Sequence, residues 1–219
     1  MPRAGLSRAA VTDVALELVD AGGPAGFETL TLAAVAAKSG VAVPSLYKHV
    51  GSLADLRRLV ATESVSELTR VLTAATIGRA GAEALRAAAD ALRGFAHTHP
   101  GRYAAAQVAA DLSDPADAEL AARGGETIAV LAGALRGFDL PEDLTTDAIR
   151  VLRSGIHGFV ILELGGGFGL PDDLDRSFAL LVDALITGIA RLTPLAAGTP
   201  NTGKVARSAK DGATFPVLD

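Results

Sequence analysis

The sequence contains no cysteine and no tryptophan, and aromatic residues make up only 4% of its 219 positions. Without cysteine the chain has no disulfide, no thiolate nucleophile and no zinc-cysteine site. It also lacks the run of about 18 apolar residues that a membrane-spanning helix needs, and its N-terminus lacks the apolar stretch of a signal peptide. These absences predict a cytoplasmic protein without membrane association.

The net charge of −5 gives the chain no general attraction for nucleic acid, but the charge is unevenly distributed. Residues 1–60 hold six basic and five acidic residues, whereas residues 61–193 hold eleven basic and eighteen acidic ones. The first sixty residues are therefore the least anionic folded part of the chain.

Hydrophobic residues make up 49% of the chain, and alanine and leucine supply most of them. This composition favours helices over strands, so we expect an all-α protein. The residues that start and end helices divide the chain into a helix-turn-helix domain at residues 1–55 and a larger helical bundle at 56–193. Residues 194–219 are rich in Gly, Pro, Thr and Ala without periodicity, which predicts a disordered tail.

Three short helices and the start of a fourth are expected in residues 7–60. Hydroxyl side chains that can cap a helix N-terminus stand at Ser7, Thr31 and Ser52. Glycines end the helices near residues 22, 40 and 51, and Pro44 suits the first turn of the third helix. Residues 24–30 are expected to be a connector. Two short helices joined by a glycine turn form a helix-turn-helix pattern.

The remaining helices are expected at about residues 81–98, 102–112, 115–137 and 141–164, and from 174 onward. The last helix has its inner face at Leu174, Phe178, Leu181, Leu185 and Ile189. Val182 and Ile186 widen this apolar stripe, which predicts deep burial or a subunit interface.

The third helix has two different sides. Leu46 and Val50, four residues apart, are expected to face the core. The outer side presents five residues, namely Val43, Pro44, Ser45, Tyr47 and Lys48. A helix that reads the major groove of DNA needs this division, because its outer N-terminal residues contact base edges. Spacing alone suits an ordinary helical corner equally well.

Other residues are candidates for contacts to DNA phosphates. Thr31 lies at a helix start with free backbone N–H groups, and His49 lies near the end of the third helix. Lys38 and the N-terminal Arg3 and Arg8 complete this set, the two arginines by reaching the backbone or minor groove.

Residues 29–56, TLTLAAVAAKSGVAVPSLYKHVGSLADL, resemble the N-terminal domain of the TetR (tetracycline repressor) family of transcriptional regulators. The resemblance rests on Gly40-Val41, Leu46-Tyr47, His49, Leu53 and Leu56. Two positions depart from the family pattern, because Ala42 replaces the usual Ser or Thr cap and Ser52-Leu53 replace a lysine. The resemblance implies a DNA-binding regulator, most simply a repressor, with a palindromic DNA operator.

Residues 154–185 are similar to the C-terminal domain of a TetR branch with a Trp-His-Gly signature. His157-Gly158 match the signature, and Ile156 stands in place of tryptophan. The resemblance implies a homodimer formed through the last two helices and a pocket for a small-molecule effector. The residues proposed to line that pocket are His97, Tyr103, Gln107, His157 and Phe159, with His99, Phe95 and Phe168 as further candidates.

Neither a cofactor nor a metal site is indicated. His97-x-His99 has no matching carboxylate pattern, and the glycine run at 165–169 lacks the Lys-Ser/Thr of a phosphate loop, so it is expected to end a helix. Glu163, in an apolar stretch, is expected either to face the pocket or to pair with an arginine.

Two alternatives stay open. A helical-bundle enzyme needs convergent acid-base groups, so two of His97, His99, His157 and Glu163 would have to share one pocket. No catalytic residues are otherwise indicated. A protein-interaction module that does not bind DNA is the second alternative, because the first sixty residues are barely basic.

Overall fold

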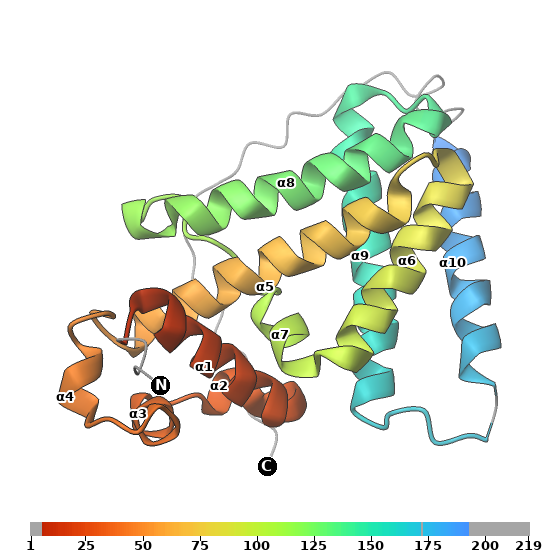
Figure 1. Ribbon diagram of the computed structural model, residues 1–219. Helices are drawn as coiled ribbons and strands as arrows, with labels where there is room; N and C mark the ends of the chain where they lie inside the picture. The colour runs from red at the N-terminus through yellow and green to blue at the C-terminus, as the bar shows by residue number, and fades with distance from the viewer. Residues whose placement is uncertain (1–5, 172, 193–219) are drawn as a thin grey trace, which may run out of the picture.

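The computed structural model describes residues 6–171 and 173–192, and in this part of the chain every regular element is helical (Figure 1). The first four helices form one end of the molecule, and the remaining six form an elongated bundle. The α-helices are α1 (Arg8–Ala21), α2 (Gly26–Thr29), α3 (Leu32–Ser39), α4 (Val43–Leu46), α5 (Leu53–Thr76), α6 (Gly81–Thr98), α7 (Pro100–Ala105), α8 (Ala118–Leu135), α9 (Glu142–Leu164) and α10 (Leu174–Ala190). Arg3 and the tail from 194 lie outside the described residues.

Local capping chemistry sets the starts of three helices as predicted. The Ser7 hydroxyl accepts a hydrogen bond from the backbone N–H of Ala10 at 3.1 Å, and Thr31 and Ser52 accept equivalent bonds at the starts of α3 and α5. Gly40 ends α3 with φ of +68°, a left-handed conformation that glycine adopts without strain. The all-α prediction is therefore confirmed for the described residues, and so are these three capped helix starts.

Several predicted boundaries were wrong. The connector after α1 is itself helical, with a 3₁₀ turn, η1 (Gly23–Ala25), followed by α2. The helix expected at 102–112 begins at Pro100 and ends at Ala105, because proline occupies its first turn and the chain then leaves the bundle as a loop. Two further 3₁₀ turns, η2 (Pro115–Asp117) and η3 (Arg136–Phe138), flank α8.

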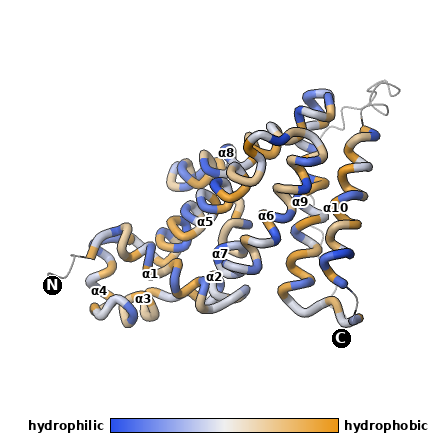
Figure 2. The backbone as a smooth tube through the Cα atoms, turned by 45° about the vertical axis from the view of Figure 1, so that its right-hand side comes forward, coloured by the Kyte–Doolittle hydropathy of each residue, from blue (hydrophilic) through white to orange (hydrophobic). Residues whose placement is uncertain are grey.

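The buried side chains form two clusters that meet within α5. One cluster includes Val11, Val35, Leu46 and Val60, and the other begins at Ala61 and continues through the bundle. The hydropathy-coloured tube shows hydrophobic positions recurring along the bundle helices (Figure 2). A single continuous helix, α5, thus begins directly after the helix-turn-helix and runs into the core of the bundle.

Helix α7 joins the two clusters at a very close backbone approach. A Cβ atom on Gly101 would lie 2.1 Å from the carbonyl oxygen of Val19, and one on Gly26 would lie 2.0 Å from the same oxygen. Asp20 Oδ2 lies 3.0 Å from Nδ1 of His99 and 2.8 Å from Nε of Arg102. The end of α1 is therefore held between α2 and α7.

A half-buried ion pair fastens α6 to α9. Arg93 Nη2 lies 2.5 Å from Glu163 Oε1, and its Nε donates to Oε2 at 2.9 Å. The guanidinium also stacks 4.8 Å from the ring centre of Phe178 and binds Asp175 on α10 at 2.7 Å. Hydrogen bonds from Arg93 hold the pKa of Glu163 below its usual range. The expected arginine partner of Glu163 is thus Arg93.

Helix α10 packs on α9 with a face that overlaps the predicted one. Phe178, Val182, Ile186 and Ile189 are buried, whereas Leu181 and Leu185 are only half-buried. Gly155 of α9 lets the helices approach, because a Cβ there would lie 2.8 Å from Leu185 Cδ1. The predicted face is thus confirmed at Phe178 and Ile189, and Val182 and Ile186, which widen the stripe, are also deeply buried.

We predict that Gly101→Ala destabilises the protein, because the added methyl group must displace the backbone at Val19. Overpacking of this kind costs about 1–3 kcal/mol, and each kcal/mol lowers Tm by roughly 2–4 °C for a chain of this size. The measurement is thermal unfolding followed by circular dichroism. Gly94→Ala in α6 is the matched control: its Cβ would meet nothing within 4 Å, so Tm should hold or rise. Equal Tm values for both variants would contradict the close-approach argument.

Candidate functional site

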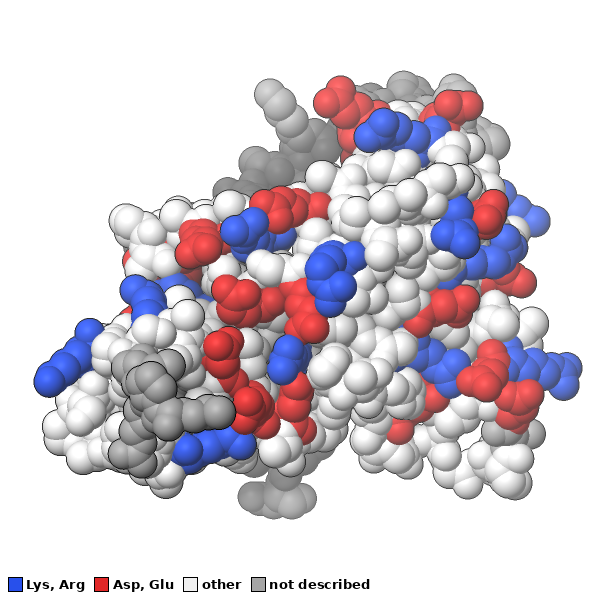
Figure 3. Space-filling view, viewed as in Figure 1, with Lys and Arg blue, Asp and Glu red and all other residues white. Residues whose placement is uncertain are grey.

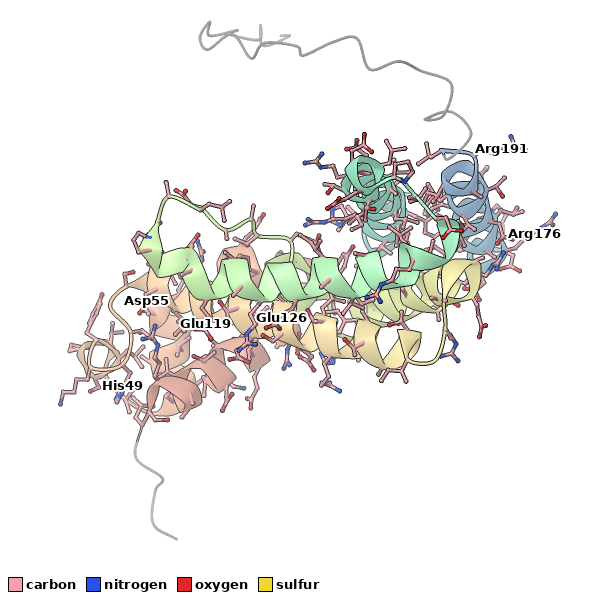
Figure 4. The ribbon with its side chains drawn as sticks, turned by 90° about the horizontal axis from the view of Figure 1, so that it is seen from above. His49, Asp55, Glu119, Glu126, Arg176 and Arg191 are labelled. Carbon is pink, nitrogen blue, oxygen red and sulfur yellow. The ribbon has the colours of Figure 1, made fainter. Side chains whose placement is uncertain are left out.

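The outer side of α4 and the turn after it is exposed at one end of the molecule. Leu46 and Val50 point into the core with 0% and 1% exposure, whereas Tyr47 is 56% exposed. Pro44 and Lys48 are also exposed, and Val43, Ser45 and His49 are half-buried. Figure 4 places His49 at this end, opposite Arg176 on α10 and Arg191, which follows the end of α10. The side chains proposed to read DNA therefore share one solvent-facing surface.

The short α4 helix is positioned by its neighbours, since it has only four residues. Ala42 provides no side-chain cap, as the sequence comparison with the TetR pattern predicted. Behind α4, the backbone N–H of Gly51 donates to Asp55 Oδ2 at 3.0 Å, and Asp55 Oδ1 binds Arg8 at 3.0 Å. The start of α5 thus fixes the turn that follows the exposed Tyr47 and Lys48.

The other phosphate candidates already have intramolecular partners. The Thr31 hydroxyl caps α3, Lys38 forms an ion pair of 3.0 Å with Glu17, and Arg8 pairs with Asp55. These side chains are partly or fully exposed, so the pairs can open toward a phosphate. Figure 3 shows basic side chains toward the α3–α4 end of this face and acidic ones gathered toward its middle. Lys48 has no carboxylate partner among the described residues.

A cavity of about 450 Å³ lies inside the bundle. Its walls come from α5, α6, α8 and α9 and from the loop after α7, and they are mostly leucine, valine, isoleucine and alanine. Tyr103, Gln107 and His157, three of the five residues proposed from the sequence, line it. This volume is within the range of small-molecule sites in proteins.

The other two proposed residues do not line the cavity. His97 is directed to Glu163, with Nε2 and Oε2 2.9 Å apart, because it lies on the α6 face that meets the Arg93–Glu163 pair. Phe159 packs in a ring cluster with Phe168 and Phe178, at centroid distances of 4.8 and 5.2 Å. Helical periodicity turns these two positions away from the cavity side of α6 and α9.

Four polar side chains of the cavity form two pairs, which join α7 and the loop after it to α9. Tyr103 Oη and His157 Nδ1 are 2.9 Å apart, and Arg153 Nη2 donates to Gln107 Oε1 at 3.1 Å. Burial raises the pKa of Tyr103, and burial together with the positive charge of Arg153 lowers the pKa of His157 below its ordinary 6.5. At neutral pH both rings are therefore uncharged, and the nearby positive charge belongs to arginine.

Sequence reasoning missed Arg150 and Arg153, which line the cavity from α9, and the loop residues Val108, Ala109, Ala110 and Leu112, which close one side. Both arginines were detectable in principle, because they stand seven and four residues before His157 and so share its side of a helix. The loop carried no signal, because its position depends on contacts far along the chain.

The contacts required for the enzyme alternative are only partly present. His97 and Glu163 are within hydrogen-bonding distance, but both oxygens of Glu163 are already bound by Arg93. Among residues 6–171 and 173–192, no three His, Cys, Asp or Glu side chains converge as a metal site would require. No described helix is long and apolar enough to cross a membrane.

Comparison with known proteins decides the family. Residues 85–185 match the model of the tetracyclin repressor-like C-terminal domain. The HTH-type transcriptional regulator Rv0681 of Mycobacterium tuberculosis is 35% identical over 192 residues, which cover 87% of this chain and 84% of that protein. The chain belongs to the TetR family of transcriptional regulators. It is accordingly a DNA-binding regulator, as the motif around Tyr47 predicted.

Two solved TetR-like structures share the fold. A TetR variant of Acinetobacter baumannii in complex with minocycline superposes with a TM-score of 0.65 at 20% identity, covering 86% of this chain and 99% of that one. BioQ bound to its double-stranded DNA operator superposes with a TM-score of 0.57 at 21% identity, covering 85% and 99%. The TetR fold seen here thus also occurs in crystals with DNA and with a small molecule.

We predict that acidification weakens this TetR protein partly through His157. Because its pKa is lowered in the folded state, the unfolded chain takes up the proton first as pH falls below about 6.5, and stability is lost in that range. His157→Gln removes this titration, so its Tm should fall less than that of the parent between about pH 7.5 and about pH 5.5. Tyr103→Phe keeps His157 and should behave like the parent. An identical pH dependence in all three proteins would contradict the prediction.

Proposed function

We propose that this TetR-family regulator is a ligand-responsive repressor that binds a palindromic operator as a homodimer. The observation that carries the proposal is the exposed surface of α4, on which Tyr47 and Lys48 have no partner that would keep them from DNA. The small-molecule cavity and its link through α7 to α1 support the response to a ligand.

Each residue of the α4 surface has a role in this proposal. Tyr47 supplies a flat ring and a hydroxyl to a base edge, and Lys48 neutralises a phosphate or donates to guanine. Pro44 and Ser45 are small enough for the helix to approach the groove closely, with Val43 beside them. Thr31, Lys38 and His49 hold the flanking phosphates, and Arg3 reaches the DNA from the N-terminus.

The second proposed element is a dimer through α9 and α10. These helices lie side by side at the end opposite α4 (Figures 1 and 4), and both expose large apolar side chains. Ile161 and Leu162 of α9 are 44% and 50% exposed, and Leu180 of α10 is 61% exposed. Apolar patches of this kind are typical of subunit interfaces. A two-fold axis there places two α4 helices on half-sites about 34–36 Å apart or a multiple of that.

Helix α7 is the proposed route from the ligand to the DNA. Tyr103 of α7 and Gln107 in the loop after it line the cavity. Gly101 and Arg102 of the same helix contact the end of α1. A ligand that displaces α7 therefore also displaces α1 and the helix-turn-helix on it. Such a ligand releases DNA only to the extent that it binds the displaced state more tightly.

We predict that Tyr47→Ala abolishes specific binding to the DNA upstream of the protein's own gene. Lys48→Ala should weaken binding to all sequences and lower the slope of log K against log salt by about one. Gel-shift titration at several salt concentrations measures both effects.

Two control variants make this test specific. Tyr47→Phe keeps the ring and separates it from the hydroxyl, and Arg136→Ala removes an exposed charge from the bundle, outside the α4 surface. Arg136→Ala should bind like the parent. If Tyr47→Ala and Lys48→Ala also bind like the parent, α4 is not the reading helix.

We predict that Leu180→Glu converts the homodimer to a monomer, because it would bury a carboxylate in an apolar interface. Size-exclusion chromatography with light scattering gives the mass directly. Tyr47→Ala is the matched control and should keep the mass of a dimer. A parent protein that is already monomeric, or a Leu180→Glu protein that stays dimeric, would rule out this interface.

A further inference from the structure

The charged side chains among the described residues of the cavity wall are all basic. The lining residues include two arginines, Arg150 and Arg153, and no aspartate or glutamate. Arg150 lies 3.0 Å from Asp147, but within the described chain Arg153 has no carboxylate partner and donates only to the neutral Gln107. An arginine with free donors beside an apolar cavity favours an anionic group on whatever enters it.

The two arginines are also confined to one part of the wall. They lie on α9, at exposed positions, next to the Tyr103–His157 and Gln107–Arg153 pairs. The opposite walls are aliphatic, with Leu68 and Leu72 of α5, Leu85 and Leu92 of α6, and Leu120 and Leu131 of α8. The site is therefore polar and cationic at its mouth and apolar inside.

Other ligand classes match this wall poorly. An organic cation needs a carboxylate or several Phe, Tyr or Trp faces, and among the described residues the lining has no carboxylate and only Tyr103 of these three types. A polyphosphate needs many donors, whereas most of the wall cannot form hydrogen bonds. A neutral apolar molecule suits the interior but leaves Arg153 without an anion.

We infer that the cavity takes an apolar monocarboxylate, with its hydrocarbon body against the leucines of α5, α6 and α8 and its carboxylate at Arg153. Arg150 gives secondary support, because Asp147 already shares its charge. The Tyr103 hydroxyl and the neutral His157 ring adjoin the carboxylate site without adding charge. This inference rests on the proposed ligand response of the same cavity and adds the chemical class of the ligand.

The test compares three probes with the same ten-carbon chain, which are decanoate, decanol and decyltrimethylammonium. Each is titrated into the full-length protein by calorimetry, below the concentration at which it forms micelles. Decanoate should bind about tenfold more tightly than decanol, the increment expected of a charge-assisted hydrogen bond. The ammonium compound should bind more weakly than decanol. Equal or tighter binding of the cation, or no binding of decanoate, would overturn the inference.

Two variants locate the carboxylate. Arg153→Met should remove the preference for decanoate over decanol while leaving decanol affinity unchanged, which also shows that the cavity is intact. Arg176→Met is the matched control, because Arg176 is exposed on α10 and does not line the cavity. This variant should keep the preference for decanoate over decanol. A preference that persists in Arg153→Met would place the anion elsewhere and overturn the assignment.

A gel-shift assay with decanoate separates this inference from the proposed function. Binding of decanoate with no release of DNA would leave the ligand class standing and contradict the ligand-responsive repressor. If decanoate does not bind, but specific DNA binding is still lost in Tyr47→Ala, the ligand class is overturned and the proposed role of α4 in DNA binding is kept.

Discussion

The approach of two glycines to the Val19 carbonyl is the constraint on which the arrangement of the molecule depends. Gly26 and Gly101 come from different parts of the chain, and neither position can hold a Cβ without moving the backbone of α1. Val19 itself is fully buried. Because packed interiors respond to displacement as units, a shift of α7 cannot be absorbed locally at this contact. The end formed by α1–α4 and the bundle are therefore mechanically connected at the C-terminal end of α1, with Asp20 adding charged contacts to His99 and Arg102.

A second connection reaches the start of α5 from the other side of the cavity. Arg58 binds Asp117 and lies 3.3 Å from Asp114, and these aspartates end the loop whose earlier residues close the cavity. Arg58 also lies 3.9 Å from Asp55, the residue that holds the turn after α4. The cavity wall thus touches the DNA-binding end at both α1 and α5. Any effect of a bound molecule on the angle of α4 has two routes, and only the one through α7 involves a close backbone contact.

The sequence predicted those features whose causes are local. The hydroxyl groups of Ser7, Thr31 and Ser52 cap helices by accepting hydrogen bonds from N–H groups three residues ahead. The burial of Leu46 and Val50 and the exposure of Tyr47 follow from the spacing of one helical turn. The cavity was only partly predictable. Tyr103, Gln107 and His157 were identified, but Arg153 was not, because its importance arises from meeting Gln107 across 46 residues of chain. His97 and Phe159 were misplaced because their contacts also lie far along the chain. His97 meets Glu163, the partner of Arg93, and Phe159 lies beside the Arg93 guanidinium.

The weakness of α4 as a helix bears on the proposed link between the cavity and DNA. Four residues with no side-chain cap cannot hold a helix on their own, because nucleation of an isolated helical turn is unfavourable. The orientation of Tyr47 and Lys48 therefore comes from burial of Leu46 and Val50 and from the bond between Gly51 and Asp55. Both supports belong to the core that includes α1 and the start of α5. A longer, self-sufficient reading helix would keep its local conformation when α1 or α5 moved, whereas this one must follow them.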